Sequence, residues 1–600
     1  MIPLSALSAI FLFAFPVLAE SGSDYRLDLS RYFPDEATEA SSRQALSAKI
    51  DAFAKEKPRD AAALEAYLDR GQTLLADLAR RMDYLRLLSS IDIQDHAALS
   101  GRDEASALYD RVDGSIAQTL AGLMPQVFAA DVKKRPSLAL FSYEVEKARR
   151  NAAHRLPPDQ QLVLNRLGDP ALTDLYSLYT AALRSTPFAK VGGLDARANR
   201  GKLLADPDPT VRAAGQKAYY EGLSSRGPVY ASILLSIVDT ETRIAKLRHF
   251  DSAPDAKYFD NLMNSADVKA ALAAIEARAD LNKRLQTLRA AHSWDMNAPL
   301  SGYSPPHLSV EETRAIAHAA LAPVGPDYVA RMDALLDPAN HRLDIGAGDD
   351  KRDAAGFSIG SGGVVTGLFV GKFDGSPNAV RTVVHEGGHA IHRSYMNGSG
   401  IPQSYTEGPN WMAEAYAIFD QFLLYDHLAA SSTDPRAKAY YLGLLTHDMA
   451  FQLFGSAEEG TLEQEIYDQA AAGKLKTAED LDALSQSVVE RFDIWPQSEP
   501  DQRHVWMSKT LLYMDPLYLV NYLYAGLLAA KLYEMALDDP ADFQPRYRAL
   551  LAEGFDAPPE MLLAHFFGHK VTTADLIPGG LAILEKRIAA LEAVQHDLDR

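Results

Sequence analysis

From Ser41 to Leu336 the sequence repeats the spacing of amphipathic helices with few interruptions. Stretches such as DVKAALAAIEARADLNKRLQTLRAAH place apolar residues three and four positions apart and contain no proline, and this spacing gives each helix one apolar stripe. Proline and glycine cluster near RLPPDQQ, KVGGLDA, DPDPT and NAPLSGYSPPH, as is typical of connections between helices. The pattern predicts an N-terminal helical lobe over residues 20–340, followed by a second lobe over residues 341–600.

The composition is that of a folded chain with a large core. Hydrophobic residues make up 47% of the 600 residues and charged residues 23%, which leaves ample apolar surface to bury. The 60 basic and 80 acidic residues give a net charge of −20. This balance disfavours nucleic acid as a partner, because such binding depends on Lys and Arg neutralising phosphates. The chain has no cysteine, so disulfides, thiolate metal ligands and cysteine nucleophiles are excluded.

The first nineteen residues, MIPLSALSAIFLFAFPVLA, are apolar and uncharged, and the polar sequence ESGSDYR follows directly. Val17 and Ala19 place small residues at positions −3 and −1 of a signal-peptidase site, and Pro16 precedes them. We therefore expect a signal peptide over residues 1–19, cleaved after Ala19, and export to a bacterial periplasm or the medium. An uncleaved membrane anchor is the alternative, since the run is nearly long enough to span a bilayer. No other stretch is apolar enough to do so.

The segment from Phe357 to Phe373, FSIGSGGVVTGLFVGKF, breaks the helical pattern. Its β-branched and aromatic residues, mixed with glycines, predict one or two short strands joined by a turn. The glycines at 360, 362 and 363 do not indicate a phosphate-binding loop, because no GKS or GKT follows them and no helix begins directly after them.

A helix is predicted from Pro377 to about Met396. Ser376 is a suitable N-cap with Pro377 at the first helical position, and NGSG at residues 397–400 ends the helix. The sequence VVHEGGHAIH lies well inside it. With 3.6 residues per turn, His385 and His389 project within about 40° of each other, and Glu386 is rotated by about 100° from His385.

This arrangement divides the work of a catalytic metal site between three side chains. Two histidines one turn apart can bind one Zn²⁺, and the glutamate can reach a water molecule on that ion and act as the base. The alternative is a surface helix with solvated polar residues. Four apolar residues, Val380, Val383, Val384 and Ile391, argue against it because they indicate a mostly buried helix. Two glycines inside the motif, at 387 and 388, each cost about 1 kcal/mol relative to alanine, so close packing or room for substrate must compensate.

A catalytic zinc needs a third protein ligand, and the next predicted helix, which starts near Pro409, offers two. In EGPNWMAEAYAIFDQF, Glu407 and Glu414 are seven residues apart and face the same way. Glu407 lies eighteen residues past His389, near the spacing of thermolysin-type enzymes, but it falls at the helix entrance, where capping explains it. Glu414, twenty-five residues past His389, lies in the body of the helix, which favours it.

The sequence resembles the thimet oligopeptidase and oligoendopeptidase F family of zinc metallopeptidases. The resemblance rests on HEGGHAIH, on AEAYAIF and on the preceding GLFVGKFDGSPNAVRTVV, and it covers about residues 351–530. The family motif HExGHxxH includes Gly388 and His392, and the zinc-binding glutamate of the family corresponds to Glu414. EGPN also resembles the related angiotensin-converting-enzyme type, a dipeptidyl carboxypeptidase.

The resemblance implies a mostly α fold: a two-lobed helical ellipsoid with a deep substrate channel and a small β-sheet beside the zinc helix. Short peptides would be the substrates, bound along a strand edge that would fall at about residues 364–372. A tyrosine hydroxyl of the family stabilises the oxyanion. In YMDPLYLVNYLYAGLLAA the offset favours Tyr522 for this role, with Tyr518 second and Tyr524 also near. Packing in a core helix is the alternative for these tyrosines.

The chain departs from the family pattern at two positions. A histidine usually precedes the tyrosines, whereas Tyr513 stands at about that place, and His504 is a possible substitute. Gly387 occupies a position where a bulky apolar residue is common. Separately, HFFGH at His565 to His569 repeats the histidine spacing but has Phe566 where a base would be needed, so it is expected to be structural.

These observations predict a zinc-dependent oligopeptidase. His385, His389 and Glu414 would bind Zn²⁺, Glu386 would take the proton of the bound water, and Tyr522 would stabilise the oxyanion. Two alternatives remain at this point: a dipeptidyl carboxypeptidase of the angiotensin-converting-enzyme type, and a non-catalytic peptide-binding protein.

Overall fold

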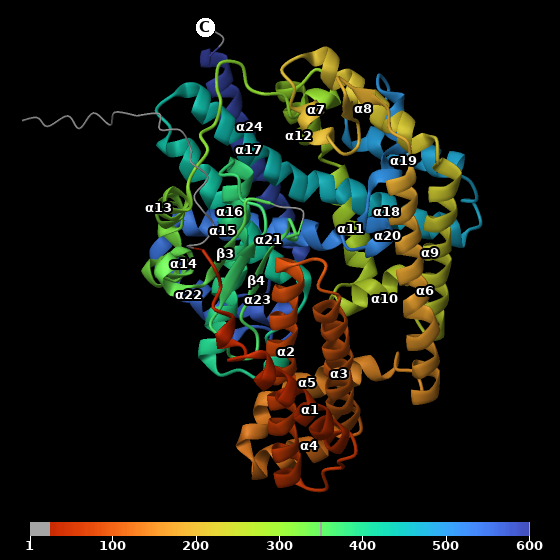
Figure 1. Cartoon of the computed structure of the whole chain (residues 1–600), viewed down its shortest axis with the longest axis vertical. Coiled ribbons are helices and arrows are strands. Elements are labelled where there is room, and N and C mark those ends of the chain that lie inside the picture. Colours follow the sequence, from red (N-terminus) through yellow and green to blue (C-terminus); the bar gives the residue numbers. More distant parts are fainter. Residues whose placement is uncertain (1–24, 349–350, 599–600) are drawn as a thin grey trace, which may run out of the picture.

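The computed structural model describes residues 25–348 and 351–598. The predicted signal peptide over residues 1–19, with its cleavage site after Ala19, lies outside the described residues. Helices make up nearly all of the regular structure (Figure 1), and this confirms the mostly α fold class. Within the described ranges, every helix is too short or too polar to cross a membrane.

The first five helices lie together at the bottom of Figure 1 and have a hydrophobic core of their own. Aspartates cap the two longest of them, since Asp60 accepts a hydrogen bond from Ala63 N and Asp95 accepts one from Ala98 N, both at 2.9 Å. The bounds are α1 (Glu36–Phe53), α2 (Ala61–Ile91), α3 (His96–Ala121), α4 (Pro125–Lys134) and α5 (Ser142–Ala152).

The next helices continue the pattern that the sequence predicted, with one break. The stretch from Asp267 to His292 forms α11 and α12, which are separated at residues 277–278 because the Arg278 backbone leaves the helical region, with φ −116° and ψ 21°. A two-stranded hairpin, β1 (Lys190–Val191) and β2 (Leu194–Asp195), follows the helix that ends at Ser185. The bounds are α6 (Pro158–Ser185), α7 (Arg200–Leu204), α8 (Pro209–Ser224), α9 (Gly227–Leu247), α10 (Ala253–Asp260), α11 (Ser265–Glu276), α12 (Ala279–Arg289), α13 (Val310–Ala320) and α14 (Pro326–Leu336).

The C-terminal half contains ten further helices among the described residues. Their bounds are α15 (Pro377–Ser399), α16 (Asn410–Ser431), α17 (Pro435–Ala450), α18 (Ser456–Ala471), α19 (Ala478–Phe492), α20 (Leu511–Met514), α21 (Val520–Asp538), α22 (Pro540–Glu553), α23 (Pro559–Phe567) and α24 (Thr573–Leu598). The largest hydrophobic core runs from Tyr179 to Leu591 and takes in residues on both sides of residue 340. The division into lobes 20–340 and 341–600 stays a prediction.

A small sheet precedes α15. It consists of β3 (Leu343–Ile345), β4 (Gly356–Ile359) and β5 (Gly367–Val370), in the order β3-β5-β4. β5 pairs in parallel with β3 and antiparallel with β4, with Phe357 opposite Phe369. The two strands predicted between Phe357 and Phe373 are confirmed. The prediction that residues 364–372 form a free edge is wrong, because β5 is hydrogen-bonded on both sides and the edge strands are β3 and β4, of which β4 lies beside Glu386.

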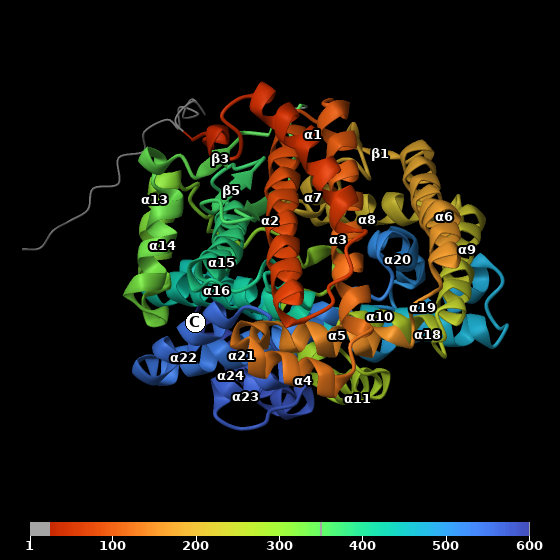
Figure 2. The ribbon, with the colours of Figure 1, turned by 90° about the horizontal axis from the view of Figure 1, so that it is seen from below.

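Helix α2 packs against this sheet. Tyr84, Leu85 and Leu87 of α2 share a buried cluster with Phe357, Ile359 and Phe369 of the sheet. Figures 1 and 2 both show α2 beside the strands, although nearly 300 residues of chain separate them. The N-terminal helices therefore supply one wall next to α15.

Candidate metal centre

Helix α15 presents His385 and His389 from its central turns. The helix begins where Ser376 Oγ accepts a hydrogen bond from Ala379 N at 3.3 Å, and it ends at Gly400, whose φ of 75° is left-handed. Val380, Val383, Val384 and Ile391 are fully buried, so the packed face fixes the helix and directs the histidines to its partly exposed side. Their rings are perpendicular, with centroids 4.8 Å apart.

Glu414 of α16 completes the group. Its Oε2 lies 3.5 Å from His385 Nε2, and its Oε1 lies 3.9 Å from His389 Nε2. The ligand atoms of the three residues all lie within 4.8 Å of one another. The side chains are between 17% and 20% exposed, so an ion held between them would be reachable from solvent. Glu407 precedes α16 and does not belong to this group.

The protonation states fit metal ligation better than an ion pair. Burial lowers the pKa of His385 well below its usual value and that of His389 to about 4, so both rings are neutral near pH 7, which is the form that binds metals. Burial, and next the charge of Glu386, raises the pKa of Glu414 to about 7. Two neutral histidines around a desolvated carboxylate gain little from one another, whereas a divalent cation would stabilise all three.

Glu386 stands apart from the three ligand atoms and lies beside the sheet. The backbone N–H of Ser358 in β4 is close enough to its carboxylate to lower its pKa. Burial raises the pKa of Glu386 to about 7, while the charge of Arg86 and the Ser358 N–H oppose the rise. Arg86, on α2, and Ser358 are the functional neighbours that the sequence did not reveal, since neither carries a local motif.

The two glycines of the motif are explained by helix packing. A Cβ on Gly388 would lie 2.9 Å from Asp420 Oδ2 and 3.1 Å from Ala417 Cα, both on α16. A Cβ on Gly387 would lie 2.7 Å from Met332 Sδ, at the end of a side chain of α14. Gly388 therefore allows the close approach of the two helices that carry the candidate metal ligands.

Comparison with known proteins finds a similar family. The sequence model of peptidase family M3 matches residues 360–578. The chain is 23% identical to an oligoendopeptidase F homologue of Lactococcus lactis over 404 residues, which are 66% of each protein, or about two thirds of that relative's length. The M3 model thus matches the part of the chain that contains α15, α16 and α21.

Solved structures share the fold of this protein across nearly the whole chain. A protein from Chlamydophila abortus superposes with a TM-score of 0.78 at 18% identity and covers 96% of this chain and 98% of its own. Oligoendopeptidase-F from Enterococcus faecium gives 0.64, also at 18% identity, with coverage of 94% and 99%. The similarity extends well beyond the residues that the sequence model matches, so the N-terminal helices belong to the shared fold.

Two tyrosines lie near Glu414 of the candidate metal centre. The rings of Tyr518 and Tyr522 meet edge to face, 5.5 Å apart. Burial, and next the charge of Glu414, raises the pKa of Tyr522 to about 12. For Tyr518, burial and the charges of Tyr522 and Glu414 raise the pKa. Both hydroxyls are therefore protonated donors near Glu414, and the oxyanion role expected for Tyr522, with Tyr518 second, stays a prediction.

Three further residues that the sequence brought into question are Tyr513, His504 and His392. Tyr513 is buried and stacks on Tyr179 at 3.8 Å. His504 does not offer a free ring nitrogen, because Nδ1 lies 3.0 Å from Asp482 Oδ1 and Arg503 Nε donates to Nε2 at 3.3 Å. His392 is buried, and its Nε2 lacks a hydrogen-bond partner.

The HFFGH segment does not form a second metal site. Helix α23 ends at Phe567, so His569 lies outside it, and Gly568 adopts a left-handed φ of 76°. His565 Nδ1 instead lies 3.3 Å from Glu553 Oε2. The prediction that these histidines are structural agrees with this geometry.

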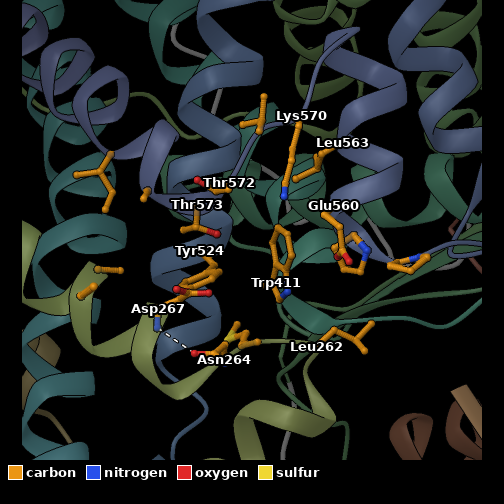
Figure 3. A pocket seen from close by; sticks show the side chains of 18 of the residues that line it. Leu262, Asn264, Asp267, Trp411, Tyr524, Glu560, Leu563, Lys570, Thr572 and Thr573 are labelled. Carbon is orange, nitrogen blue, oxygen red and sulfur yellow. Dashed lines mark hydrogen bonds between the residues drawn. The ribbon is translucent and has the colours of Figure 1, made fainter. Parts of the chain in front are cut away.

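A cavity of about 820 Å³ lies on the side of α16 and α21 where Trp411 and Tyr524 meet. Figure 3 shows these two rings facing Lys570, Thr572 and Thr573 from the segment before and at the start of α24. None of the metal-binding residues, Glu386 or Tyr522 lines it. This cavity is therefore separate from the candidate metal centre.

Proposed function

We propose that this protein is a zinc-dependent oligopeptidase that hydrolyses short peptides. The observation that carries the proposal is the convergence of His385, His389 and Glu414 within 4.8 Å, from two helices whose approach a glycine permits. The match of residues 360–578 to the model of peptidase family M3 and the similarity to an oligoendopeptidase F homologue support it.

The donor set suits a catalytic zinc. Two imidazole nitrogens and one carboxylate are a common ligand set of hydrolytic zinc sites, which keep a fourth position open. Among the described residues the cluster has three members, with no fourth side chain to close it. A zinc ion held there would activate a water molecule and polarise the peptide carbonyl.

Glu386 is placed to move the proton. The Ser358 N–H lies near its carboxylate, and a pKa of about 7 would let Glu386 accept a proton from water and then release it to the leaving amine near neutral pH. Tyr522, protonated at this pH, is placed to donate a hydrogen bond to the oxyanion.

The free edge of β4 is suited to hold the peptide backbone. Gly371 N donates to Ala355 O at 2.9 Å, and antiparallel pairs alternate, so Phe357 is a hydrogen-bonded partner of Phe369. The polar backbone groups of Gly356 and Ser358 consequently point away from β5. The Ser358 N–H lies near Glu386, while the Ser358 carbonyl and both backbone groups of Gly356 are available to a substrate that adds as a strand.

The proposal is tested by measuring zinc content and turnover of quenched-fluorescent peptides, before and after chelation, for the wild type and Glu386→Gln. We expect about one zinc per chain, loss of turnover on chelation, and a fall of about 10²- to 10⁴-fold in the variant with zinc retained. Unchanged hydrolysis by Glu386→Gln would contradict the proposed role of Glu386.

The same measurements separate the two alternative functions. A dipeptidyl carboxypeptidase would lose activity on peptides with a blocked C-terminus, whereas an oligoendopeptidase would cleave them internally. A non-catalytic binding protein would bind the peptides without turnover and without a requirement for zinc.

A further inference from the structure

One arginine beside the candidate metal centre is held in place without a carboxylate partner. The Arg86 guanidinium of α2 lies over the Phe357 ring of β4, with Cζ 3.8 Å from the ring centroid. Phe357 is buried, and its ring also stacks on Phe369 with the centroids 4.8 Å apart. The stacking contact fixes the guanidinium plane next to the strand whose outer edge is free.

Arg86 differs in its partners from other arginines of the same helix. Arg70 pairs with Glu56, and Arg80 donates to Asp77 at 2.8 Å. Arg86 is exposed to solvent, and among the described residues no carboxylate lies within 4.0 Å of it and no acceptor takes its hydrogen bonds. A guanidinium carries five N–H donors, so Arg86 has most of its hydrogen-bonding capacity available.

The charges that face Arg86 come from three elements and leave the site cationic. Asp83 is the nearby acid on α2, but its Oδ2 already accepts from Gly360 N at 2.9 Å and from Ser361 N at 2.7 Å. Arg102 of α3 and Arg393 of α15 are close enough to affect the pKa of Arg86. Glu386 is the other anion near it. A cluster of three arginines is notable in a chain of net charge −20.

Desolvation by the elements packed around Arg86 lowers its pKa although part of the side chain reaches solvent, and the guanidinium stays charged at neutral pH because its unperturbed pKa exceeds 12. Arg393 is partly engaged, since its Nη1 donates to Ser361 Oγ at 2.8 Å. Arg86 is therefore the cation of the cluster with both a fixed orientation and free donors.

We propose that Arg86 binds a carboxylate of the bound peptide and so determines the specificity of the enzyme. The inference rests on the proposed function for the nature of its ligand. A peptide added along β4 would pass Phe357, and an arginine can hold a carboxylate through two parallel hydrogen bonds. The carboxylate is either an Asp or Glu side chain or the C-terminus of the peptide.

The alternative role for Arg86 is to stabilise the Glu386 carboxylate without touching the substrate. The two roles predict different kinetics. Loss of a substrate contact raises KM, or lowers kcat/KM, only for those peptides that carry the carboxylate. Loss of a partner for Glu386 lowers kcat for every peptide and shifts the acid limb of the pH–rate profile.

The test compares the wild type with Arg86→Gln and Arg86→Lys on matched quenched-fluorescent peptides. One series places Asp or Glu, and then Asn or Gln, at successive positions around the cleaved bond. A second series compares a free C-terminus with an amide. Arg70→Gln on the same helix is the control, and thermal unfolding verifies that each variant is folded.

We expect wild-type protein to prefer one of the carboxylate series, and Arg86→Gln to lose about tenfold to a hundredfold in kcat/KM on that series alone. The Lys variant keeps the charge but not the paired donors, so its loss should be smaller. The series that responds identifies the source of the carboxylate. Equal losses on acidic and neutral peptides, or a shifted pH–rate profile, would overturn the inference.

Binding measurements keep the inference separate from the proposed function. Calorimetry compares the Glu386→Gln variant with the double variant that also carries Arg86→Gln, and neither is expected to cleave the peptide. It measures the affinity of each protein for an acidic peptide and for the matched peptide in which an amide replaces the carboxylate. If the wild type cleaves no peptide but the acidic peptide binds about tenfold more weakly without Arg86, the proposed function fails and the inference stands. Equal affinities in all four combinations overturn the inference whatever the turnover.

Discussion

Replacing Gly388 by alanine tests whether the close approach of α15 and α16 sets the metal site. The added methyl group would lie 2.9 Å from Asp420 Oδ2 and 3.1 Å from Ala417 Cα. Both neighbours belong to α16, and Ala417 is a backbone contact that cannot rotate away. The two helices must therefore separate by a few tenths of an ångström. Glu414 lies one turn before Ala417, so it moves with that part of α16.

Two opposing effects set the magnitude for Gly388→Ala. Alanine in place of glycine stabilises a helix interior by about 1 kcal/mol. Overpacking of a tight contact costs about 1 to 3 kcal/mol. The expected result is a net loss of up to about 2 kcal/mol in the free energy of unfolding, with zinc bound about tenfold more weakly because a supporting contact of a ligand is displaced.

Two further glycines of α15 provide matched controls. Gly398 has no atom within 4 Å of an added Cβ, so Gly398→Ala measures the gain in helix propensity alone. Gly387 meets Met332 at the thioether, which is flexible and can repack. Gly387→Ala should therefore keep zinc affinity within about twofold of the wild type.

The assay is competition for zinc against a chromophoric chelator, together with thermal unfolding of the zinc-free and zinc-loaded proteins. We expect Gly388→Ala to be the one variant of the three with weakened zinc binding and a lowered unfolding temperature. If Gly388→Ala bound zinc like the wild type and unfolded at a higher temperature, as Gly398→Ala should, the packing argument would be refuted.

Three other predictions follow from the site. Tyr522→Phe should lower kcat by about 10²- to 10³-fold with little change in KM, because the lost hydroxyl serves the oxyanion; an equal effect of Tyr518→Phe alone would reassign the role. Glu414→Gln should weaken zinc binding in the competition assay without unfolding the protein, because the carboxylate is a proposed ligand and lies in no other polar contact that the fold needs. Burial lowers the pKa of His392 to about 3, below its unfolded value of about 6.5. The unfolded state therefore takes up protons first as pH falls below about 6.5, and the zinc-free protein should lose about 2 kcal/mol by pH 5 through this group; His392→Phe should remove that part of the pH dependence of unfolding.

The helix that carries the motif was predictable because its signals are local. Ser376, Pro377 and the glycine at position 400 lie next to the turns that they begin or end, and the histidines needed for the site are one turn apart. Glu414 required one more assumption, that the next helix packs against the first. Its position in the body of α16 and the family resemblance favoured it over Glu407, and the structure places it beside both histidines.

The order of the strands was not predictable from the same sequence. β3 has three residues, LDI, and gives no alternating pattern long enough to recognise. Once β3 pairs with β5, the apolar strand that seemed free becomes the centre of the sheet. The edge beside Glu386 passes to β4, and with it the backbone groups of Gly356 and Ser358. A missed strand of three residues thus moved the expected substrate-binding edge to a different segment.

Arg86 shows where sequence-based inference about specificity ends. Arg70, Arg80 and Arg86 occur in one helix with similar neighbours in sequence, but the fold pairs the first two with acids and leaves the third against Phe357. The contact joins α2 to β4 across about 270 residues, and it depends on the hydrophobic cluster that packs α2 on the sheet. The proposed zinc ligands and the proposed base lie within α15 and α16, whereas the proposed carboxylate preference depends on how a distant helix docks. Changes in that docking could alter substrate choice while the zinc ligands stay in place.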